Sequence, residues 1–253
     1  PKQLEVLELI RQCQNEHGYS PTMQELAQHI GVSKVTVFER VEALIRKGAL
    51  TREANRARSL SIAEELAEKY EQEENAVLEI IRNHKTIMGE KVKQFEQEIA
   101  ALFSKDQGIM VNSGSSANLL TFEVLDIPEN SEVITPILTF ATTLSPIIKK
   151  GLIPVFVDVE PETYVVNIDQ IEQSITNKTR ALMIPSLLGN IPDLKRLRKI
   201  ADENNLIFIE DSADTLGATF DGIPTGKFSD VSTTSFYGSH IITAAGDGGM
   251  ICC

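Results

Sequence analysis

One motif of the chain could form an anion-binding site. The stretch from Asn112 to Asn118 reads NSGSSAN, follows the apolar run GIMVN and precedes the helical run LLTFEVL. This order places Gly114, Ser115 and Ser116 at a helix N-terminus, where free backbone N–H groups and the helix dipole favour a phosphate. Glycine- and serine-rich helix starts are also common as simple caps, so the motif alone leaves both interpretations open.

Acid–base chemistry is indicated by two further segments. The run LIFIED ends in Glu210 and Asp211, and a buried carboxylate usually has a cationic partner because burying it alone is costly. Asp211 could therefore bind a cationic ligand group or form a structural salt bridge. In SFYGSHIITAAGDGG, His240 follows Ser235, and no lysine occurs from residue 228 to residue 253. An imidazole with its ordinary pKa of about 6.5 is mostly neutral near pH 7 and can act as a base.

The elements that must position these residues are short apolar runs that alternate with helical stretches. The runs lie at 108–112, 132–136, 153–159, 181–185 and 206–211. Each is typical of a buried strand, and strands that alternate with helices predict an α/β sheet. Open sheets of this class bind ligands at the carboxyl ends of their strands, where the motifs lie. Phe140, in TPILTFATT, is assigned to the core by default.

Residues 1–62 have a different pattern, that of a helix-turn-helix with a wing. Thr22 and Glu25 have the spacing of a capping box, Ser33 can cap a further helix, and the stretch 49–62 alternates like a two-stranded wing. These residues hold nine Lys and Arg against seven Asp and Glu, a formal charge of +2 that leaves −14 for the remainder. Helix, helix-turn-helix and wing is a DNA-binding order, although a winged helix used only for protein contacts stays an alternative.

The stretch GYSPTMQELAQHIGVSKVTVFERVEALIRKGAL closely resembles the winged-helix DNA-binding domain of LexA-type repressors. The resemblance implies that double-stranded DNA is a partner and that the helix from Lys34 enters the major groove. The implied base and phosphate contacts are Ser33, Lys34, Thr36, Glu39, Arg40, Arg52, Arg56 and Arg58. Nothing after residue 62 resembles the self-cleaving peptidase domain that such repressors also carry.

Residues 89–253 resemble the DegT-type sugar aminotransferase family, which has the fold type I (aspartate aminotransferase-like) architecture and binds pyridoxal 5'-phosphate. The landmarks VNSGSSANLL, TPILTFATT, IEDSADTLGA and SFYGSHIITAAGDGG occur in the family's order. The implied fold class is α/β, with a winged helix-turn-helix domain over 1–62, a helical linker over 63–88 and a transferase-like large domain over 89–253. We expect this large domain to be incomplete at its C-terminus, because family members continue with a small domain.

The resemblance also implies the roles of individual residues. By this resemblance, the cofactor phosphate is bound by Gly114, Ser115 and Ser235. Phe140 stacks on the cofactor ring, and Asp211 pairs with the ring nitrogen. The full implied cofactor-binding set is Gly114, Ser115, Ser116, Phe140, Asp211, Asp214, Ser235 and His240.

Position 240 separates this chain from most of the family, whose members place there a lysine that forms a Schiff base and shuttles protons. The replacement by His240 resembles the nucleotide-sugar 3-dehydratases of deoxysugar and lipopolysaccharide biosynthesis. That resemblance implies a pyridoxamine 5'-phosphate cofactor bound without a covalent bond, a nucleotide-linked 4-keto-6-deoxy sugar as substrate, and His240 as catalytic base. Two alternatives are a degenerate pseudo-enzyme and a transcription regulator whose aminotransferase-like domain senses a ligand.

Composition and cysteine content bear on membrane insertion, disulfide bonds and metal binding. The 253 residues carry a formal net charge of −12 and are 42% hydrophobic, with no apolar run that approaches the roughly 18 residues of a membrane span. The N-terminus lacks a secretory pattern, and Cys13, Cys252 and Cys253 suit neither a disulfide framework nor a four-ligand metal site. We therefore expect a cytoplasmic protein without a metal. A homodimer is expected because both resembled domains function around a two-fold axis.

Overall fold

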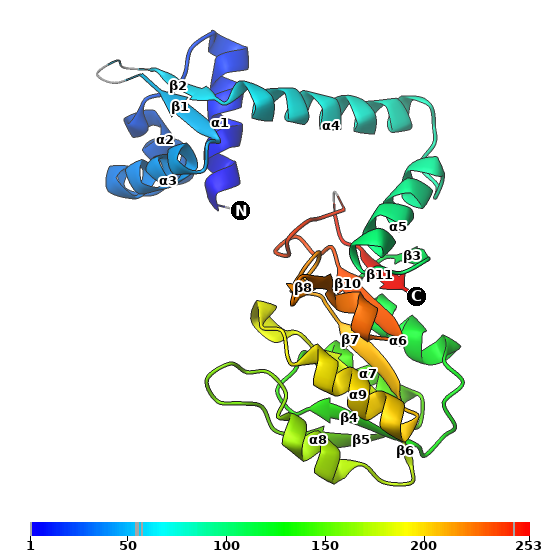
Figure 1. Ribbon diagram of the computed structural model, residues 1–253. Helices are drawn as coiled ribbons and strands as arrows, with labels where there is room; N and C mark the ends of the chain where they lie inside the picture. Colours follow the sequence, from blue (N-terminus) through cyan, green and yellow to red (C-terminus); the bar gives the residue numbers. More distant parts are fainter. Residues whose placement is uncertain (1, 54–55, 57, 245) are drawn as a thin grey trace. The chain divides into compact units, whose positions relative to one another are not determined.

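The protein is described here by a computed structural model that covers residues 2–53, 56, 58–244 and 246–253. The chain divides into two compact units, residues 1–87 and residues 88–253, and Figure 1 labels their elements. Each unit has buried apolar clusters of its own. The helix expected over 63–88 is α4 (Glu64–Arg82), which belongs to the first unit.

In the first unit, three helices and a two-stranded wing precede α4. These elements are α1 (Lys2–His17), α2 (Met23–Ile30), α3 (Lys34–Arg46), and the antiparallel strands β1 (Leu50–Arg52) and β2 (Leu60–Ile62). Thr22 and Glu25 form the predicted capping box of α2. Gly31 then ends α2 with a φ of 72°, a left-handed conformation that glycine adopts without steric cost.

The second unit is built around a seven-stranded sheet. Its strands are β3 (Gly108–Val111), β4 (Glu132–Pro136), β5 (Ile153–Val157), β6 (Thr179–Pro185), β7 (Ile207–Asp211), β10 (Val231–Ser235) and β11 (Gly249–Cys252), in the spatial order β3-β11-β10-β7-β6-β4-β5. Strand β11 is antiparallel to both of its neighbours, and the other strand pairs are parallel. The carboxyl ends of six strands therefore meet at one edge of the sheet.

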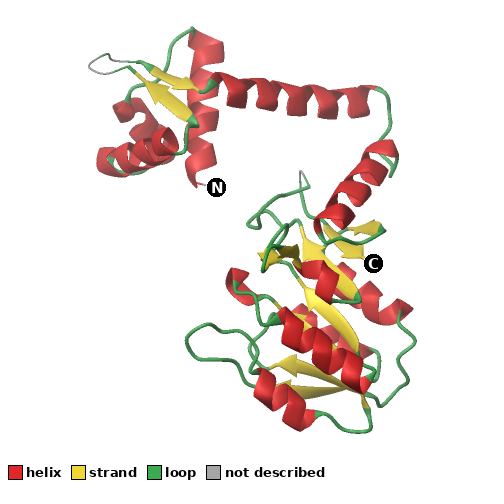
Figure 2. Ribbon diagram, viewed as in Figure 1, coloured by secondary structure: helices red, strands yellow, loops and turns green. Residues whose placement is uncertain are grey.

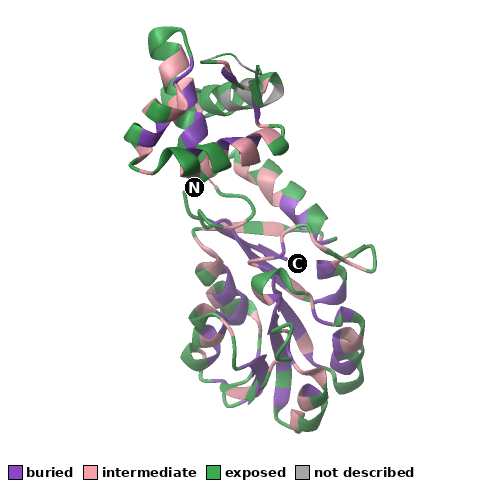
Figure 3. Cartoon of the chain, turned by 90° about the vertical axis from the view of Figure 1, so that its left-hand side faces the viewer, coloured by how far each residue is buried: buried purple, intermediate pink, exposed green. Residues whose placement is uncertain are grey.

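Helices cover both faces of this sheet, as the ribbon in Figure 2 shows. They are α5 (Glu90–Leu102), α6 (Gly114–Val124), α7 (Ala141–Lys149), α8 (Ile168–Ser174) and α9 (Leu194–Asn204). Successive residues of β6 face opposite sides, because side chains alternate along a strand. Leu182 packs in the cluster that includes residues of α8 and α9, whereas Met183 packs in the cluster that includes residues of α6 and α7. Figure 3 shows the buried residues along the strands and the exposed ones on the outer surfaces of the helices. The unit is a three-layer α/β fold.

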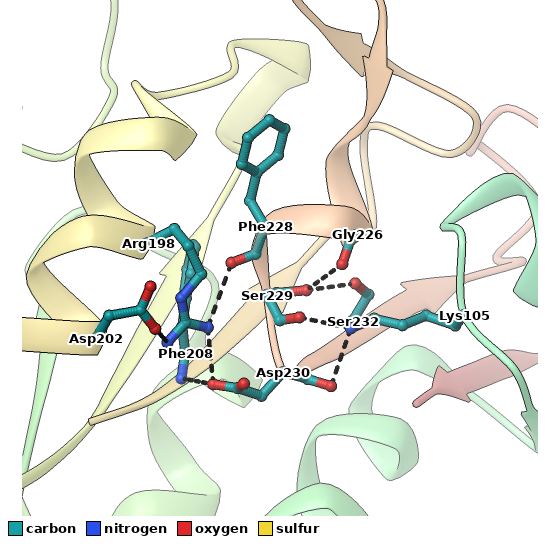
Figure 4. A network of polar contacts seen from close by, with 9 residues as sticks. All are labelled: Lys105, Arg198, Asp202, Phe208, Gly226, Phe228, Ser229, Asp230 and Ser232. Atoms are coloured by element: carbon teal, nitrogen blue, oxygen red, sulfur yellow. Dashed lines mark hydrogen bonds and ion pairs between the residues drawn. The ribbon is translucent and has the colours of Figure 1, made fainter. Parts of the chain in front are cut away.

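A network of polar contacts anchors the start of β10 (Figure 4). Lys105 Nζ donates to the carbonyl oxygens of Ser229, at 2.5 Å, and Asp230, at 3.0 Å. The Asp230 carboxylate accepts from Arg198 Nη1 at 3.0 Å and from the backbone N–H of Phe208 at 2.7 Å. Burial lowers the pKa of Lys105. These contacts tie β10 to α9 and β7, and so position the residues that follow β10.

Candidate active site

A cavity of about 680 Å³ opens at the carboxyl ends of the parallel strands. Segments that follow β3, β4, β6, β7 and β10 all contribute to its lining. The sequence-predicted residues that line it are Gly114, Ser115, Phe140, Asp211, Asp214, Ser235 and His240. Ser116 is not among its lining residues. Side chains from positions 114 to 240 are thus brought together at the edge where open α/β sheets bind ligands.

The N-terminus of α6 forms one end of the cavity and packs closely on the end of β10. A Cβ atom added to Gly114 would lie 2.7 Å from Ser235 Cβ, so only glycine permits this approach. The side chain of Ser113 caps α6 by accepting the backbone N–H of Ser116 at 3.1 Å. That bond uses the N–H of Ser116 for the cap, whereas the first N–H groups of a helix have no partner within the helix. The N–H groups of Gly114 and Ser115, with the Ser115 and Ser235 hydroxyls, are suited to an anion such as a phosphate.

Asp211 is a buried carboxylate at the end of β7, with only 8% of its surface exposed. Its Oδ2 accepts from Asn118 Nδ2 at 2.9 Å and from Thr143 Oγ1 at 2.8 Å, and its Oδ1 accepts the N–H of Ala213 at 3.3 Å. Burial raises the pKa of Asp211 above its ordinary value. Within the described part of the chain this carboxylate has only neutral donors as partners, so the structural salt bridge considered from the sequence is not formed there. A cationic ligand group would supply the missing countercharge.

Asn118 and Thr143 are site residues that sequence reasoning did not single out. Asn118 lies one helical turn after Gly114 on α6, and Thr143 lies three residues after Phe140 at the start of α7. Thr233 Oγ1 donates to Asn118 Oδ1 at 2.6 Å, which turns the amide nitrogen of Asn118 toward Asp211. Within NSGSSAN, Gly114 and Asn118 have the i, i+4 spacing that places two residues on one face of a helix. This spacing was the available sequence signal for Asn118.

Phe140 is exposed over 68% of its surface, and it lines the cavity from the position just before α7. The default assignment of Phe140 to the core is therefore wrong. A large exposed aromatic side chain costs free energy in water unless a ligand or partner covers it. Its ring is available to contact a flat ligand in the cavity.

His240 lies at the cavity wall with both ring nitrogens next to oxygen atoms. Nδ1 is 3.3 Å from the carbonyl oxygen of Ser235, and Nε2 is 3.8 Å from Asp214 Oδ1. The other carboxylate oxygen of Asp214 accepts the N–H of Leu188 at 2.9 Å, and Leu188 has a left-handed φ of 56°. In the tautomer whose Nδ1–H donates to Ser235, Nε2 has the free lone pair. A proton taken up there would lie beside the Asp214 carboxylate.

The residues predicted to contact DNA lie in the first unit and differ in availability. Ser33 caps α3 by accepting the N–H of Thr36 at 3.1 Å, and Thr36 is partly buried. Lys34 and Glu39 are exposed on α3. The side chain of Arg40 is only 14% exposed, and its Nη1 lies 3.6 Å from Glu5 of α1. Arg40 is therefore largely covered by the domain, although its buried Nη1 has no hydrogen-bond partner among the described residues.

The three wing arginines also have partners of their own. Arg58 pairs with Glu25 at 2.6 Å, donates to the carbonyl of Ser20 and lies 4.4 Å from the centre of the Tyr19 ring. Arg52 lies 3.8 Å from Glu42, and Arg56 lies 2.7 Å from Glu53. The Arg56 side chain is 70% exposed, so of the three it is the most accessible to a partner.

The part of the chain that the structure describes contains neither a membrane-spanning helix nor a metal-binding cluster. No helix there is both long and apolar enough to cross a bilayer. Nor do three or more His, Cys, Asp or Glu side chains gather there in a way that could hold a metal ion. Cys252 is buried in β11, whereas Cys253 is exposed.

Comparison with protein families identifies both parts of the chain. Residues 67–253 match the DegT/DnrJ/EryC1/StrS aminotransferase family, and the chain belongs to that family. Residues 1–59 match the LexA DNA binding domain. The predicted α/β class, a winged helix-turn-helix domain followed by a fold type I transferase-like domain, is confirmed.

Three similar proteins indicate which members of the family the chain resembles. A dTDP-4-dehydro-2,6-dideoxy-D-glucose 3-dehydratase of Saccharopolyspora spinosa is 40% identical over 70% of this chain and 40% of its own length. The lipopolysaccharide biosynthesis protein RfbH of Salmonella typhimurium is 42% identical over 62% of this chain and 38% of its own. The E. coli GDP-4-keto-6-deoxy-D-mannose-3-dehydratase with bound hydrated PLP has a TM-score of 0.67 and 32% identity, covering 71% of this chain and 48% of that one. The chain thus spans less than half the length of these three proteins.

Proposed function

We propose that the chain contributes the cofactor site of a pyridoxamine 5'-phosphate- or pyridoxal 5'-phosphate-dependent enzyme that removes the 3-hydroxyl group of nucleotide-linked 4-keto-6-deoxy sugars. The observation that carries this proposal is His240, which lines the cavity at the position where the family's lysine is expected. An imidazole can accept and return a proton but forms no stable imine with an aldehyde. The names of the 3-dehydratases among the relatives support the same reaction class.

The residues of the cavity fit such a cofactor at three points. Gly114, Ser115 and Ser235 offer N–H and hydroxyl groups to the phosphate at the N-terminus of α6. The ring of Phe140 is exposed into the cavity and would contact the pyridine ring. The buried carboxylate of Asp211, which has neutral partners only, would bind the protonated ring nitrogen. When bound, the cofactor supplies an amine for the 4-keto group and a ring that withdraws electrons, so that the 3-hydroxyl can leave.

The chain's own residues would transfer a proton and keep the imidazole that transfers it in position. His240 would take up and return a proton at Nε2, while its Nδ1–H donates to the carbonyl of Ser235 and fixes the ring. Asp214 would keep the imidazole oriented and stabilise it when protonated, since its Oδ1 lies 3.8 Å from Nε2. The N–H of Leu188 holds the other oxygen of Asp214. Ser116, whose N–H is taken by the helix cap, would support the phosphate site indirectly.

A pair of substitutions at position 240 tests this role. We expect His240→Asn to retain pyridoxamine 5'-phosphate binding, because the phosphate, ring and ring-nitrogen contacts come from other side chains. Loss of the 3-hydroxyl from a nucleotide-linked 4-keto-6-deoxy sugar, followed by mass spectrometry, should fall about a hundred- to ten-thousandfold. His240→Lys should instead form a lysine–pyridoxal phosphate adduct that borohydride traps.

The wild-type chain provides the control for the second substitution. Borohydride treatment of wild-type protein with pyridoxal 5'-phosphate should leave no adduct within residues 228–253, which contain no lysine. Dialysis should remove the bound cofactor from the wild-type protein. Dehydration by His240→Asn at the wild-type rate would show that His240 is not the base.

DNA binding by the N-terminal domain is the second part of the proposal, and the match of residues 1–59 to the LexA DNA binding domain supports it. The same match favours a second candidate function, a transcription regulator whose aminotransferase-like domain senses a ligand. The two differ in their response to the cofactor and substrate. A sensor should change its DNA affinity when pyridoxamine 5'-phosphate and a nucleotide sugar are added, whereas an enzyme with an attached DNA-binding domain should not. Gel-shift titrations with and without these ligands separate the two.

We place the protein in the cytoplasm as a homodimer, with nucleotide sugar and double-stranded DNA as partners. One two-fold axis could serve both a paired cofactor site and two DNA half-sites. Light scattering of the chain with bound pyridoxamine 5'-phosphate should report twice the mass of 27.9 kDa. A stable monomer under these conditions would contradict the dimer.

A further inference from the structure

Helix α3 has two large apolar side chains that the domain does not cover. Val35 is 68% exposed and Phe38 is 46% exposed. The opposite side of the same helix is well packed, since Val37, Val41 and Leu44 are buried in the core of the first unit. Val35 and Phe38 are three residues apart, so they lie on one face of the helix. We call these two side chains the α3 apolar pair.

The position of this pair in the helix suggests what covers it. The pair lies in the first half of the second helix of a helix-turn-helix, the part that contacts base edges in the major groove when such a domain binds DNA. In the major groove the apolar group that a base presents is the C5-methyl of thymine, and apolar side chains recognise it by contact. Glu39, which is exposed beside the pair, can accept a hydrogen bond from the N4 amino group of a cytosine.

The exposed cations of α3 and the wing fit a polyanionic partner. Lys34 precedes the pair, Arg46 and Lys47 follow at the other end of α3, and all three are exposed. The exposed Arg56 lies in the wing. The formal charge of residues 1–62 is +2, although the chain as a whole carries −12. Cations at the two ends of α3 and in the wing can bind phosphates while the apolar side chains contact bases.

We infer that Val35 and Phe38 determine sequence specificity by contacting thymine methyl groups in the major groove of double-stranded DNA. This inference rests on the proposed DNA binding and specifies how that site distinguishes sequences. It also moves base recognition away from Arg40, which lies 3.6 Å from Glu5 with 14% of its side chain exposed. Arg40 lies at the contact between α3 and α1, and the base-contacting surface is the α3 apolar pair with Glu39.

The experiment replaces thymine by uracil, which removes only the methyl group. The full chain first selects its preferred duplex from a random pool, and each thymine of that duplex is then replaced by deoxyuridine in turn. Each contacted methyl should contribute about fourfold in affinity, because burying one such group is worth about 0.8 kcal/mol. Thymines outside the α3 footprint should be replaceable without loss.

Protein variants assign the lost affinity to side chains. Val35→Ala and Phe38→Ala should each bind thymine- and uracil-containing duplexes equally at one particular base position. Both side chains are exposed, so their truncation should leave the fold intact, which circular dichroism checks. Leu4→Ala in α1 is the matched control, because Leu4 is 44% exposed but lies outside α3. It should retain the wild-type preference for thymine.

The outcomes separate the inference from the proposed function. If the chain retains no duplex at low salt, DNA binding itself is refuted, and the inference with it. If the chain binds a selected duplex but every thymine can be replaced by uracil without loss, DNA binding stands and the role of Val35 and Phe38 is refuted. If the variants keep the wild-type discrimination between thymine and uracil, other side chains contact the methyl groups and the inference fails.

Discussion

Replacing Asp211 by Asn should stabilise the ligand-free protein and weaken cofactor binding at the same time. Asp211 is buried, and its partners are the neutral donors Asn118, Thr143 and the N–H of Ala213. Burial raises the pKa of Asp211 because desolvation outweighs these hydrogen bonds. An asparagine resembles the protonated carboxyl group, so the substitution removes the cost of carrying a charge into the fold.

The size of the effect follows from the contacts. Asn118 and Thr143, at 2.9 and 2.8 Å, would bind a neutral amide oxygen, with a loss of about 1 kcal/mol each relative to a charged acceptor. The N–H of Ala213, now 3.3 Å from the carboxylate, would face the new amide nitrogen and lose its bond, at a cost of about 1 kcal/mol. Removing a buried and unpaired carboxylate gains several kcal/mol. The net gain in unfolding free energy should be about 1 to 2 kcal/mol at neutral pH. Loss of the charge-assisted bond to a ring nitrogen should weaken pyridoxamine 5'-phosphate binding about tenfold to a hundredfold.

The sign of the pH dependence follows from the raised pKa. Above the folded-state pKa of Asp211 the wild-type protein carries the full penalty, so the advantage of the variant is largest there. The advantage should shrink as the pH falls through that pKa and vanish below the ordinary value of 3.8, where the carboxyl group is protonated in both states. Urea unfolding from pH 3 to pH 8 measures this, with Asp126→Asn as the control because Asp126 is exposed.

Opposite signs for stability and affinity distinguish this reasoning from general damage to the fold. A destabilised protein would lose both stability and cofactor binding. A variant whose stability is unchanged at neutral pH, or whose gain is the same at pH 3 and pH 8, would refute the account of Asp211 as a desolvated carboxylate that awaits a cationic ligand.

The remaining predictions concern one glycine and one carboxylate. Gly114→Ala should cost about 1 to 3 kcal/mol in unfolding free energy and weaken phosphate binding, because the new Cβ would lie 2.7 Å from Ser235 Cβ. Gly238→Ala is its control, since nothing lies within 4 Å of a Cβ there, and equal losses in both would contradict the steric argument. Hydrogen bonds from Thr22 and Arg58 lower the pKa of Glu25 from 4.5 to about 2, so wild-type stability should fall as the pH drops from 4.5 to 2. Glu25→Gln should lack that part of the acid transition in circular dichroism, and an identical acid transition in both proteins would argue against it.

Much of the fold could be predicted from the sequence because periodicity records which faces are buried. The five predicted apolar runs form β3, β4, β5, β6 and β7, since parallel strands covered on both faces read as continuous apolar stretches. Strand β10, with the sequence VSTTS, is equally buried but lacks that signal. Its hydroxyl groups bond to buried polar partners, as Thr233 does to Asn118 at 2.6 Å. A buried polar strand is stable only when such partners exist, and they lie far away in sequence.

For the candidate site, too, the sequence predicted the residue types but not the surroundings of each side chain. Residue types along the chain predicted a phosphate-binding helix start, an aromatic residue and a carboxylate, and the fold brings them to one cavity. Residue types could not indicate which hydrogen bonds and ion pairs each residue already makes within the fold. Ser116 and Arg40 have the right chemistry and spacing, yet the helix cap uses the N–H of Ser116, and the side chain of Arg40 is only 14% exposed beside Glu5. Phe140 is the opposite case. The sequence alone assigns an aromatic residue to the core, yet the fold leaves this side chain exposed in the cavity. Tertiary neighbours set which groups are available, so an exposed apolar side chain or a buried carboxylate without a countercharge marks a candidate ligand contact that residue type alone does not reveal.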